Sequence, residues 1–234
     1  MDKLSQVSKQ TPISQTPQLT QDWGNAPDVS VFYGRQAELA TLKKWIIDNQ
    51  CRLVAISGMG GIGKTAVAAK LAQEIQHEFE YLIWRSLRKP RSLKELITSL
   101  IQFLSGQSKP DLSNDEDEII SQLLEYLKKH RSLIILDSLE FILKNQEFAG
   151  FYQEDYQNYS KFFQRLGTER HESCLLITSR DKPREIAIVS GDTGLVRDLN
   201  LVGFQLEAAQ EILQEKGLFG EKYWNQLIKY YQGN

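Results

Sequence analysis

Five short apolar runs lie along the chain from residue 53 onwards, each bounded by polar, glycine or proline residues. They occupy residues 53–56, 81–87, 133–137, 173–180 and 195–201. The first run, Leu53-Val54-Ala55-Ile56, shows no alternation of apolar and polar positions, which is typical of strands buried on both faces of a parallel sheet. The runs therefore predict a five-stranded parallel sheet.

Between these runs, apolar residues recur at the three- and four-residue spacing of amphipathic helices. The expected helices cover residues 36–49, 64–75, 92–104, 114–130, 160–166, 207–216 and 223–231. A Ser113-x-x-Glu116 capping box predicts where the fourth of them begins. Strands that alternate with helices in this way indicate an α/β fold, a doubly wound parallel sheet with helices on both faces.

The first 29 residues carry a different pattern. They are rich in Gln, Ser and Thr, hold three of the six prolines, and have only scattered large apolar side chains. Such a composition buries too little apolar surface to offset the entropy lost on folding, so residues 1–29 are expected to be a disordered arm or linker. Asp22 and Trp23, near the end of the arm, are expected to pack back onto the folded body.

Composition and charge argue against nucleic-acid binding, a disulfide or zinc site, and a membrane span. A 234-residue chain with 41% hydrophobic residues can bury a full core, and its net charge of −2 gives no general reason to expect a nucleic-acid partner. Cys51 and Cys174 are far apart and form no C-x-x-C pair, so reduced thiols are expected rather than a disulfide or a zinc site. No apolar run approaches the roughly 20 residues that a bilayer requires, which predicts a cytoplasmic protein with no membrane partner.

One glycine-rich stretch carries the main chemical signal. Its sequence, Gly58-Met59-Gly60-Gly61-Ile62-Gly63-Lys64-Thr65, matches the phosphate-loop pattern G-x-x-x-x-G-K-[ST] between a strand candidate and a helix candidate. Glycines let the backbone approach a ligand closely, and the first N–H groups of a helix lack acceptors inside it, so a polyphosphate satisfies them. We expect Lys64 to contact the β- and γ-phosphates and the Thr65 hydroxyl to bind Mg²⁺.

Two further strand candidates end in charged residues. Asp137 follows the apolar run 133–136, so it is expected at the carboxyl edge of the sheet, beside the phosphates, as a Mg²⁺ partner through water. Arg180 ends the run 173–180, and two interpretations stay open. Its side chain either reaches the same edge of the sheet, or it faces solvent or pairs with a nearby acid such as Asp181.

Three motifs, in order along the chain, resemble a known family. The phosphate loop is similar to that of NB-ARC proteins, members of the STAND class of signal-transduction ATPases that includes plant resistance proteins and the apoptosome scaffold. Val31-Phe32-Tyr33-Gly34-Arg35 resembles the family element that holds the adenine, and Thr178-Ser179-Arg180 resembles the strand whose arginine reads the γ-phosphate. The resemblance covers about residues 29–234. It implies a P-loop NTPase that binds ATP or ADP with Mg²⁺.

The chain departs from the family pattern at two places. Ser138 stands where NB-ARC proteins usually carry a second acid after the Walker B aspartate. The segment Asp137-Ser138-Leu139-Glu140 is more similar to the NACHT branch, which makes Glu140 the nearby candidate for orienting a water. Gly233-Asn234 resembles the family's Gly-Asn-Pro element without its proline. The resemblance thus implies the nucleotide-binding part of a longer protein, whose bacterial relatives often continue into WD-type or tetratricopeptide repeats.

These motifs define the expected domains and site residues. Residues 30–220 are assigned to the P-loop nucleotide-binding domain and 221–234 to the start of a truncated helical subdomain. The residues expected to act in catalysis or sensing are Asp137, Glu140 and Arg180, and those expected to bind the metal are Thr65 and Asp137. The residues expected to bind the nucleotide are Val31, Phe32, Gly34, Arg35, Gly58, Met59, Gly60, Gly61, Ile62, Gly63, Lys64, Thr65 and Ala66.

Three functions are compatible with the sequence. The leading hypothesis is a regulatory switch, in which ADP holds a closed form and exchange for ATP changes how flanking domains pack and lets protomers assemble. A switch of this kind would have the nucleotide, further copies of the chain and other proteins as partners. Slow ATP hydrolysis is compatible with it. The second hypothesis is an ordinary ATPase or kinase whose turnover is the function. The third is a DNA-associated loader ATPase, although the chain lacks a basic recognition segment.

Overall fold

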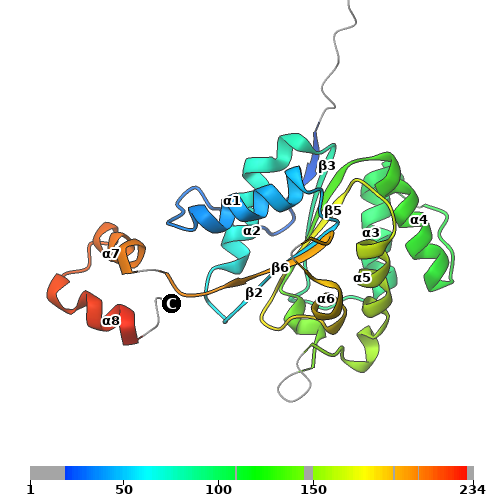
Figure 1. The fold of residues 1–234 in the computed structure, drawn as a ribbon. Coiled ribbons are helices and arrows are strands. Elements are labelled where there is room, and N and C mark those ends of the chain that lie inside the picture. Colours follow the sequence, from blue (N-terminus) through cyan, green and yellow to red (C-terminus); the bar gives the residue numbers. More distant parts are fainter. Residues whose placement is uncertain (1–18, 109, 145–149, 192, 205, 231–234) are drawn as a thin grey trace, which may run out of the picture.

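A computed structural model describes residues 19–108, 110–144, 150–191, 193–204 and 206–230. In this part of the chain one sheet separates two layers of helices (Figure 1). The strands are β1 (Thr20–Asp22), β2 (Leu53–Gly58), β3 (Tyr81–Ser86), β4 (Ser132–Asp137), β5 (Cys174–Ser179) and β6 (Val196–Leu201). The α-helices are α1 (Gln36–Lys43), α2 (Lys64–Ile75), α3 (Leu93–Ser105), α4 (Glu116–Lys129), α5 (Asn158–Thr168), α6 (Arg184–Val189), α7 (Leu206–Glu215) and α8 (Trp224–Tyr230). Short helical turns lie at Lys44–Asp48, Gln76–Glu78, Leu139–Ile142, Glu154–Tyr156 and Glu221–Tyr223.

The strand order decides which residues meet at the carboxyl edge of the sheet. The order is β1-β3-β4-β5-β2-β6, and every neighbouring pair is parallel. The α/β fold with a doubly wound parallel sheet is therefore confirmed. β5 lies between β2, which leads into the phosphate loop, and β4, which ends in Asp137. The last residues of β5 consequently lie between these two elements.

The predicted number of strands was wrong, because the described sheet has six strands and not five. The additional strand is β1, at the edge of the sheet, where the Thr20 N–H donates to the Glu80 carbonyl at 2.8 Å. Asp22 forms an ion pair with Arg85 at 2.8 Å, and Trp23 packs against the core, as expected for the end of the arm. An edge strand exposes much of its surface, so its Thr-Gln-Asp sequence carries no apolar signal. Residues 1–18 of the predicted arm lie outside the described residues.

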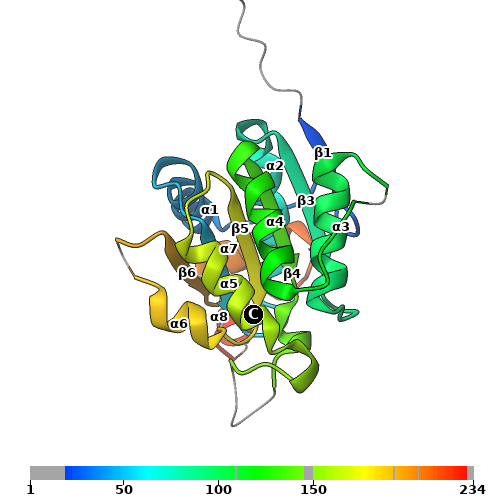
Figure 2. The same cartoon turned by 90° about the vertical axis from the view of Figure 1, so that its right-hand side faces the viewer.

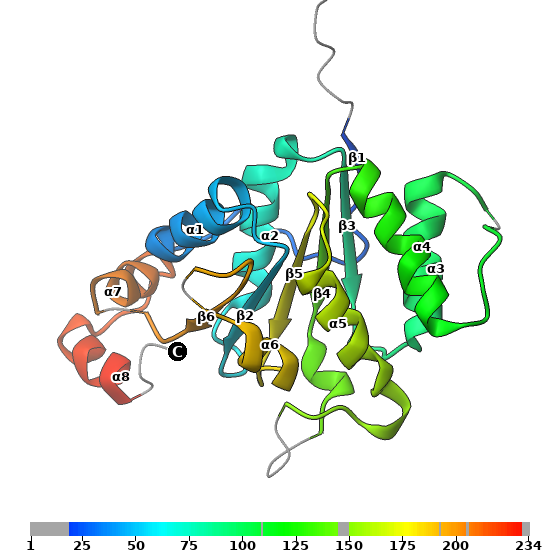
Figure 3. The same ribbon diagram turned by 45° about the vertical axis from the view of Figure 1, so that its right-hand side comes forward.

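Two hydrophobic cores lie on opposite faces of the sheet. Successive side chains of a strand point to opposite faces, so Leu53 and Ala55 of β2 join the core under α3, α4 and α5, whereas Val54 and Ile56 join the core under α1 and α2. Figure 2 shows α3, α4, α5 and α6 over one face, and Figure 3 shows the sheet between the two layers. Burial on both faces explains why these strands lack polar positions.

Side-chain caps mark the starts of α3 and α4, and one of them corrects the sequence prediction. Ser92 and Glu95 form a capping box at the start of α3. The capping box predicted at Ser113 was wrong, because α4 is capped by Asp115, whose carboxylate accepts hydrogen bonds from the N–H groups of Asp117 at 2.9 Å and Glu118 at 3.0 Å. An aspartate closer to the first turn therefore provides the cap.

The C-terminal helices α7 and α8 lie beyond the β6 edge of the sheet (Figure 1). They contact each other more than any other element, and they expose several large apolar side chains, including Phe219 at 100% and Tyr230 at 80% of the maximal area. None of the helices in the described ranges is long and apolar enough to span a bilayer.

Candidate functional site

The phosphate loop connects the carboxyl end of β2 to the first turn of α2. Its backbone leaves the strand at Gly58 with a φ of +142°, a conformation that side chains disfavour. A Cβ at Gly58 would also lie only 2.5 Å from the Leu201 carbonyl oxygen of the neighbouring strand β6. The loop can therefore pass so close to β6 only because this residue is glycine.

The start of α2 presents unused donors to the loop. The hydrogen bond from the Val67 N–H to the Gly63 carbonyl, at 2.9 Å, begins the backbone ladder of the helix. The N–H groups of Lys64, Thr65 and Ala66 precede this bond, in the first turn, where helical N–H groups lack intrahelical acceptors. Together with the helix dipole, they make this turn suitable for an anion.

Lys64 is folded against the loop. Its ammonium group donates to the carbonyls of Gly58 at 2.8 Å and Met59 at 2.9 Å. Burial lowers the pKa of Lys64, and the nearby carboxylate of Glu140 opposes this shift. Because an ammonium group carries three N–H donors, the two bonds to the loop leave one for an anionic ligand.

The carboxylate of Asp137, at the end of β4, is surrounded by hydroxyl groups. Thr65 and Thr178 each donate a hydrogen bond to its Oδ1 at 2.7 Å, and Ser138 donates to its Oδ2 at 3.1 Å. The structure thus brings the two predicted metal ligands, Thr65 and Asp137, into direct contact. Ser138 itself has a left-handed backbone with a φ of 66°, and the Arg88 Nε donates to its hydroxyl at 3.4 Å.

The Thr65 hydroxyl and the Asp137 carboxylate could bind a Mg²⁺ ion only together with other ligands. A hydroxyl and a carboxylate oxygen are the kind of hard ligands that Mg²⁺ prefers. Among the described residues no group of three or more His, Cys, Asp or Glu side chains could hold a metal ion. A Mg²⁺ ion at Thr65 and Asp137 would therefore take its remaining ligands from water and phosphate oxygens.

Glu140 and Arg180, from different segments, meet beside the phosphate loop. Glu140 lies in the short helical turn Leu139–Ile142, and Arg180 follows β5 directly. Their side chains form an ion pair with 3.5 Å between Arg180 Nε and Glu140 Oε1. The Glu140 side chain is 16% exposed and the Arg180 side chain 60% exposed. Arg180 therefore lies at the sheet edge beside the phosphate loop, where its side chain is also largely exposed to solvent and paired with an acid.

The segment that resembles the family's adenine element borders a cavity of about 250 Å³. The residues that line it are Val31, Phe32, Tyr33, Arg35, Gly61, Ile62, Gly63, Ala66, Val67, Phe204 and Ile212. Arg35 is buried, donates to the Ile62 carbonyl of the phosphate loop at 3.3 Å, and stacks over the Phe204 ring at 4.1 Å. The cavity thus lies between the first predicted motif, the phosphate loop and residues leading into and along α7.

Three of the six buried side-chain polar atoms that have no partner among the described residues belong to residues in this region. Within the described residues, no hydrogen-bond partner is found for Arg35 Nε, Glu140 Oε2 or Ser179 Oγ. Native proteins satisfy most buried polar groups, so such a cluster fits a site that a polar ligand and water complete.

Sequence reasoning missed five residues of this region, which are Tyr33, Val67, Thr178, Phe204 and Ile212. Thr178, although part of the sensor motif, was not assigned to the site, and Phe204 and Ile212 lay in no motif. Thr178 could have been predicted, because it lies in a buried strand two residues before the expected sensor arginine. No sequence feature predicted Phe204 and Ile212, because they reach the cavity from about 170 residues after the first motif.

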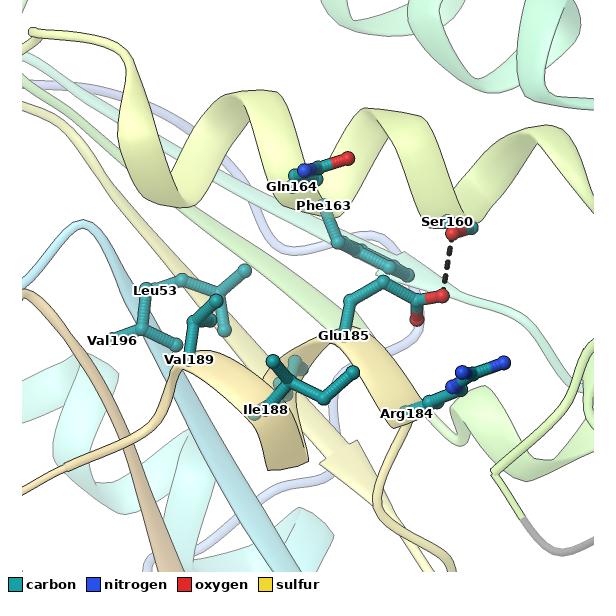
Figure 4. Close-up of a pocket in the computed structure, with 10 residues that line it drawn as sticks. Leu53, Ser160, Phe163, Gln164, Arg184, Glu185, Ile188, Val189 and Val196 are labelled. Carbon is teal, nitrogen blue, oxygen red and sulfur yellow. Dashed lines mark hydrogen bonds between the residues drawn. The ribbon is translucent and has the colours of Figure 1, made fainter.

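A second cavity, of about 270 Å³, contains no predicted site residue. Figure 4 shows it between α5 and α6, where the Ser160 hydroxyl donates to the Glu185 carboxylate. Leu53 and Val196, which line it, are the first residues of β2 and β6. This cavity therefore borders the amino ends of β2 and β6 and extends to Arg184 and Glu185 at the start of α6.

Comparisons with known proteins agree with this geometry. The sequence profile of the NB-ARC domain matches residues 35–183. An uncharacterized WD repeat-containing protein of Nostoc sp. is 45% identical over 223 residues, which are 91% of this chain and 18% of that protein. A probable disease resistance protein of Arabidopsis thaliana is 29% identical over 115 residues, 47% of this chain and 13% of that protein.

Among solved structures, a STAND protein with a tetratricopeptide repeat sensor from Pyrococcus horikoshii has a TM-score of 0.63 at 24% identity. The match covers 91% of this chain and 30% of that chain, and at this identity it supports the fold alone. The chain spans less than a fifth of the length of the two curated relatives.

Proposed function

This chain belongs to the NB-ARC domain family of STAND-class P-loop NTPases, and we propose on that basis that it is an ATP- and ADP-dependent regulatory switch within a larger protein. The observation that carries the proposal is the convergence of Lys64, Thr65, Asp137 and Arg180 on one edge of the sheet, from three separate segments. Cations, hydroxyl and carboxylate in this arrangement suit a nucleoside polyphosphate with its metal ion.

The proposed roles follow from the chemistry of each group. The N–H groups at the start of α2 and the Lys64 ammonium bind the phosphates. Thr65 and Asp137 hold Mg²⁺, which when bound neutralises phosphate charge. The cavity between the 31–35 segment and Phe204 takes the base. Arg180, which is 60% exposed and adjacent to the loop, is free to follow the third phosphate.

A switch needs more than tight binding. A ligand shifts a conformational equilibrium only by the difference between its affinities for the two states. The cavity offers a route to such a difference, because Phe204 and Ile212 connect it to α7, whereas its other walls belong to the α/β body. Nucleotide in this cavity would therefore favour one position of α7 relative to the sheet.

The proposal extends to the whole protein. Residues 30–220 form the nucleotide-binding domain, and 221–234 begin a helical subdomain, of which residues 231–234 lie outside the described residues. The apolar surface of α7 and α8 supports contacts with flanking domains or with further copies of the chain. A cytoplasmic location fits these roles.

The first experiment identifies the nucleotide that copurifies with the chain. The parent is compared with Lys64→Ala and with Lys70→Ala, a control lysine farther along α2. We expect stoichiometric ADP in the parent and in the control, and none in Lys64→Ala. A parent that is empty and also fails to take up labelled ADP or ATP would contradict the proposal.

A further inference from the structure

Arg180 lies directly over the phosphate loop. A Cβ added to Gly60 would be 3.2 Å from both the Cζ and the Nε of Arg180, so the guanidinium lies against the glycine backbone. The side chain is nevertheless 60% exposed. It follows that Arg180 covers the position next to Lys64 and can leave it without breaking the hydrophobic core.

The buried surroundings of Glu140 hold its side chain in place, whereas the side chain of Arg180 is exposed. Its neighbours Leu139 and Ile142 in the same turn are fully buried, and the turn starts from the left-handed Ser138. Its side chain is only 16% exposed, and one carboxylate oxygen, Oε2, has no hydrogen-bond partner among the described residues. The ion pair therefore has one anchored partner and one movable partner.

The geometry of the pair makes it easy to break. A distance of 3.5 Å is long for a charge-assisted hydrogen bond, and only one nitrogen of Arg180 takes part. The Arg180 side is largely solvated, so the contact contributes little to stability. A phosphate placed at the loop would offer the same guanidinium up to three strong acceptor oxygens.

We propose that Glu140 holds Arg180 in the resting site and that the third phosphate of a nucleoside triphosphate competes with it for the guanidinium. This inference rests on the proposed function and adds the residue that sets the preference between ATP and ADP. With ADP, Arg180 stays on Glu140. With ATP, Arg180 moves to the third phosphate, and both oxygens of Glu140 become available to water. Glu140 is thus a positioning residue that weakens ATP binding relative to ADP binding.

The test measures dissociation constants of ADP and of a non-hydrolysable ATP analogue by calorimetry, with Mg²⁺ present. For Glu140→Gln, which keeps the size of the side chain, we expect the analogue to bind about five-fold more tightly and ADP to change less than about two-fold. Thermal melting of each variant verifies that it is folded.

Two controls separate competition from simple charge repulsion. Asp181→Asn removes another carboxylate whose charge reaches Lys64 but which forms no ion pair with Arg180. The second control is Glu140→Gln in an Arg180→Ala background. If Glu140 acts through Arg180, its substitution no longer changes the ratio of the two constants in that background.

The outcomes distinguish this inference from the function it rests on. Failure of the parent to bind either nucleotide would overturn the proposed function and the competition together. Binding of both nucleotides with an unchanged ratio in Glu140→Gln would overturn the competition alone. The competition is also overturned if the analogue gains the same affinity in the Arg180→Ala background or in Asp181→Asn, because general repulsion then explains the effect.

Discussion

At the scale of single residues, the site depends on one buried threonine. Thr178 is 1% exposed, donates to Asp137 Oδ1 at 2.7 Å and accepts a hydrogen bond from the Ser138 N–H at 2.9 Å. It therefore fixes the carboxylate that faces the phosphate loop and the strained residue that follows it. β5 can supply this contact because it lies between β2 and β4.

We predict that Thr178→Val lowers the free energy of unfolding by about 1–3 kcal/mol, since valine keeps the shape but leaves a buried N–H and a carboxylate oxygen without this partner. Urea denaturation measures the change. The matched control is Thr41→Val, whose hydroxyl bonds only to the Ala37 carbonyl of its own helix, with an expected loss under about 0.5 kcal/mol. Equal losses for the two variants would contradict the role of Thr178.

At the scale of elements, sequence patterns revealed neither the short helix α6 nor the edge strand β1. It pairs in parallel with β3, with Gln21 opposite Leu82, and its Thr20 N–H bonds to Glu80. Adjacent N–H groups of a strand point in opposite directions, so the Gln21 N–H points away from β3.

Proline substitutions test this pairing. We predict that Thr20→Pro lowers the free energy of unfolding by about 1 kcal/mol more than Gln21→Pro, because only the first removes a donor that bonds to β3. Both variants restrict φ equally, so each serves as the control for the other. Denaturant unfolding gives the difference, and equal stabilities would mean that β1 is not held by this hydrogen bond.

At the scale of the whole molecule, the cavity beside the phosphate loop joins the α/β body to α7. Phe204 precedes the helix and stacks on Arg35, and Ile212 of the helix lines the same cavity. A Cβ at Gly34 would lie 3.0 Å from the Phe204 ring and 3.5 Å from Ala208, so the glycine lets α7 approach closely.

We therefore predict that ADP slows amide hydrogen exchange in α7 as well as in the phosphate loop. At a ligand concentration 100 times its dissociation constant, binding to the folded state adds about 2.7 kcal/mol of stability. Mass-spectrometric exchange with and without ADP locates the protection, and Lys64→Ala is the control that should show none. Protection limited to the α/β body would contradict coupling between the nucleotide and α7.

The sequence allowed most of the fold to be predicted, for identifiable reasons. The runs that became β2, β4 and β5 were recognisable because burial on both faces removes polar positions from a strand. β1 was not predicted, because an edge strand needs no apolar residues. The start of α4 was misplaced because Ser113 and Asp115 are both good capping residues, and their distance from the first turn decides between them.

By itself, the sequence determined the phosphate loop, the strand before it and the helix after it, since the chemistry of a loop and its two neighbours is encoded within about twenty consecutive residues. Only the tertiary structure decided that β5 separates β2 from β4, that Thr178 supports Asp137, and that Arg180 rests on Glu140. It also brought Phe204 and Ile212 to the cavity beside Arg35. These contacts join residues tens to more than a hundred positions apart. Hydrophobic periodicity predicts single strands and helices, but it does not indicate which of them pack together.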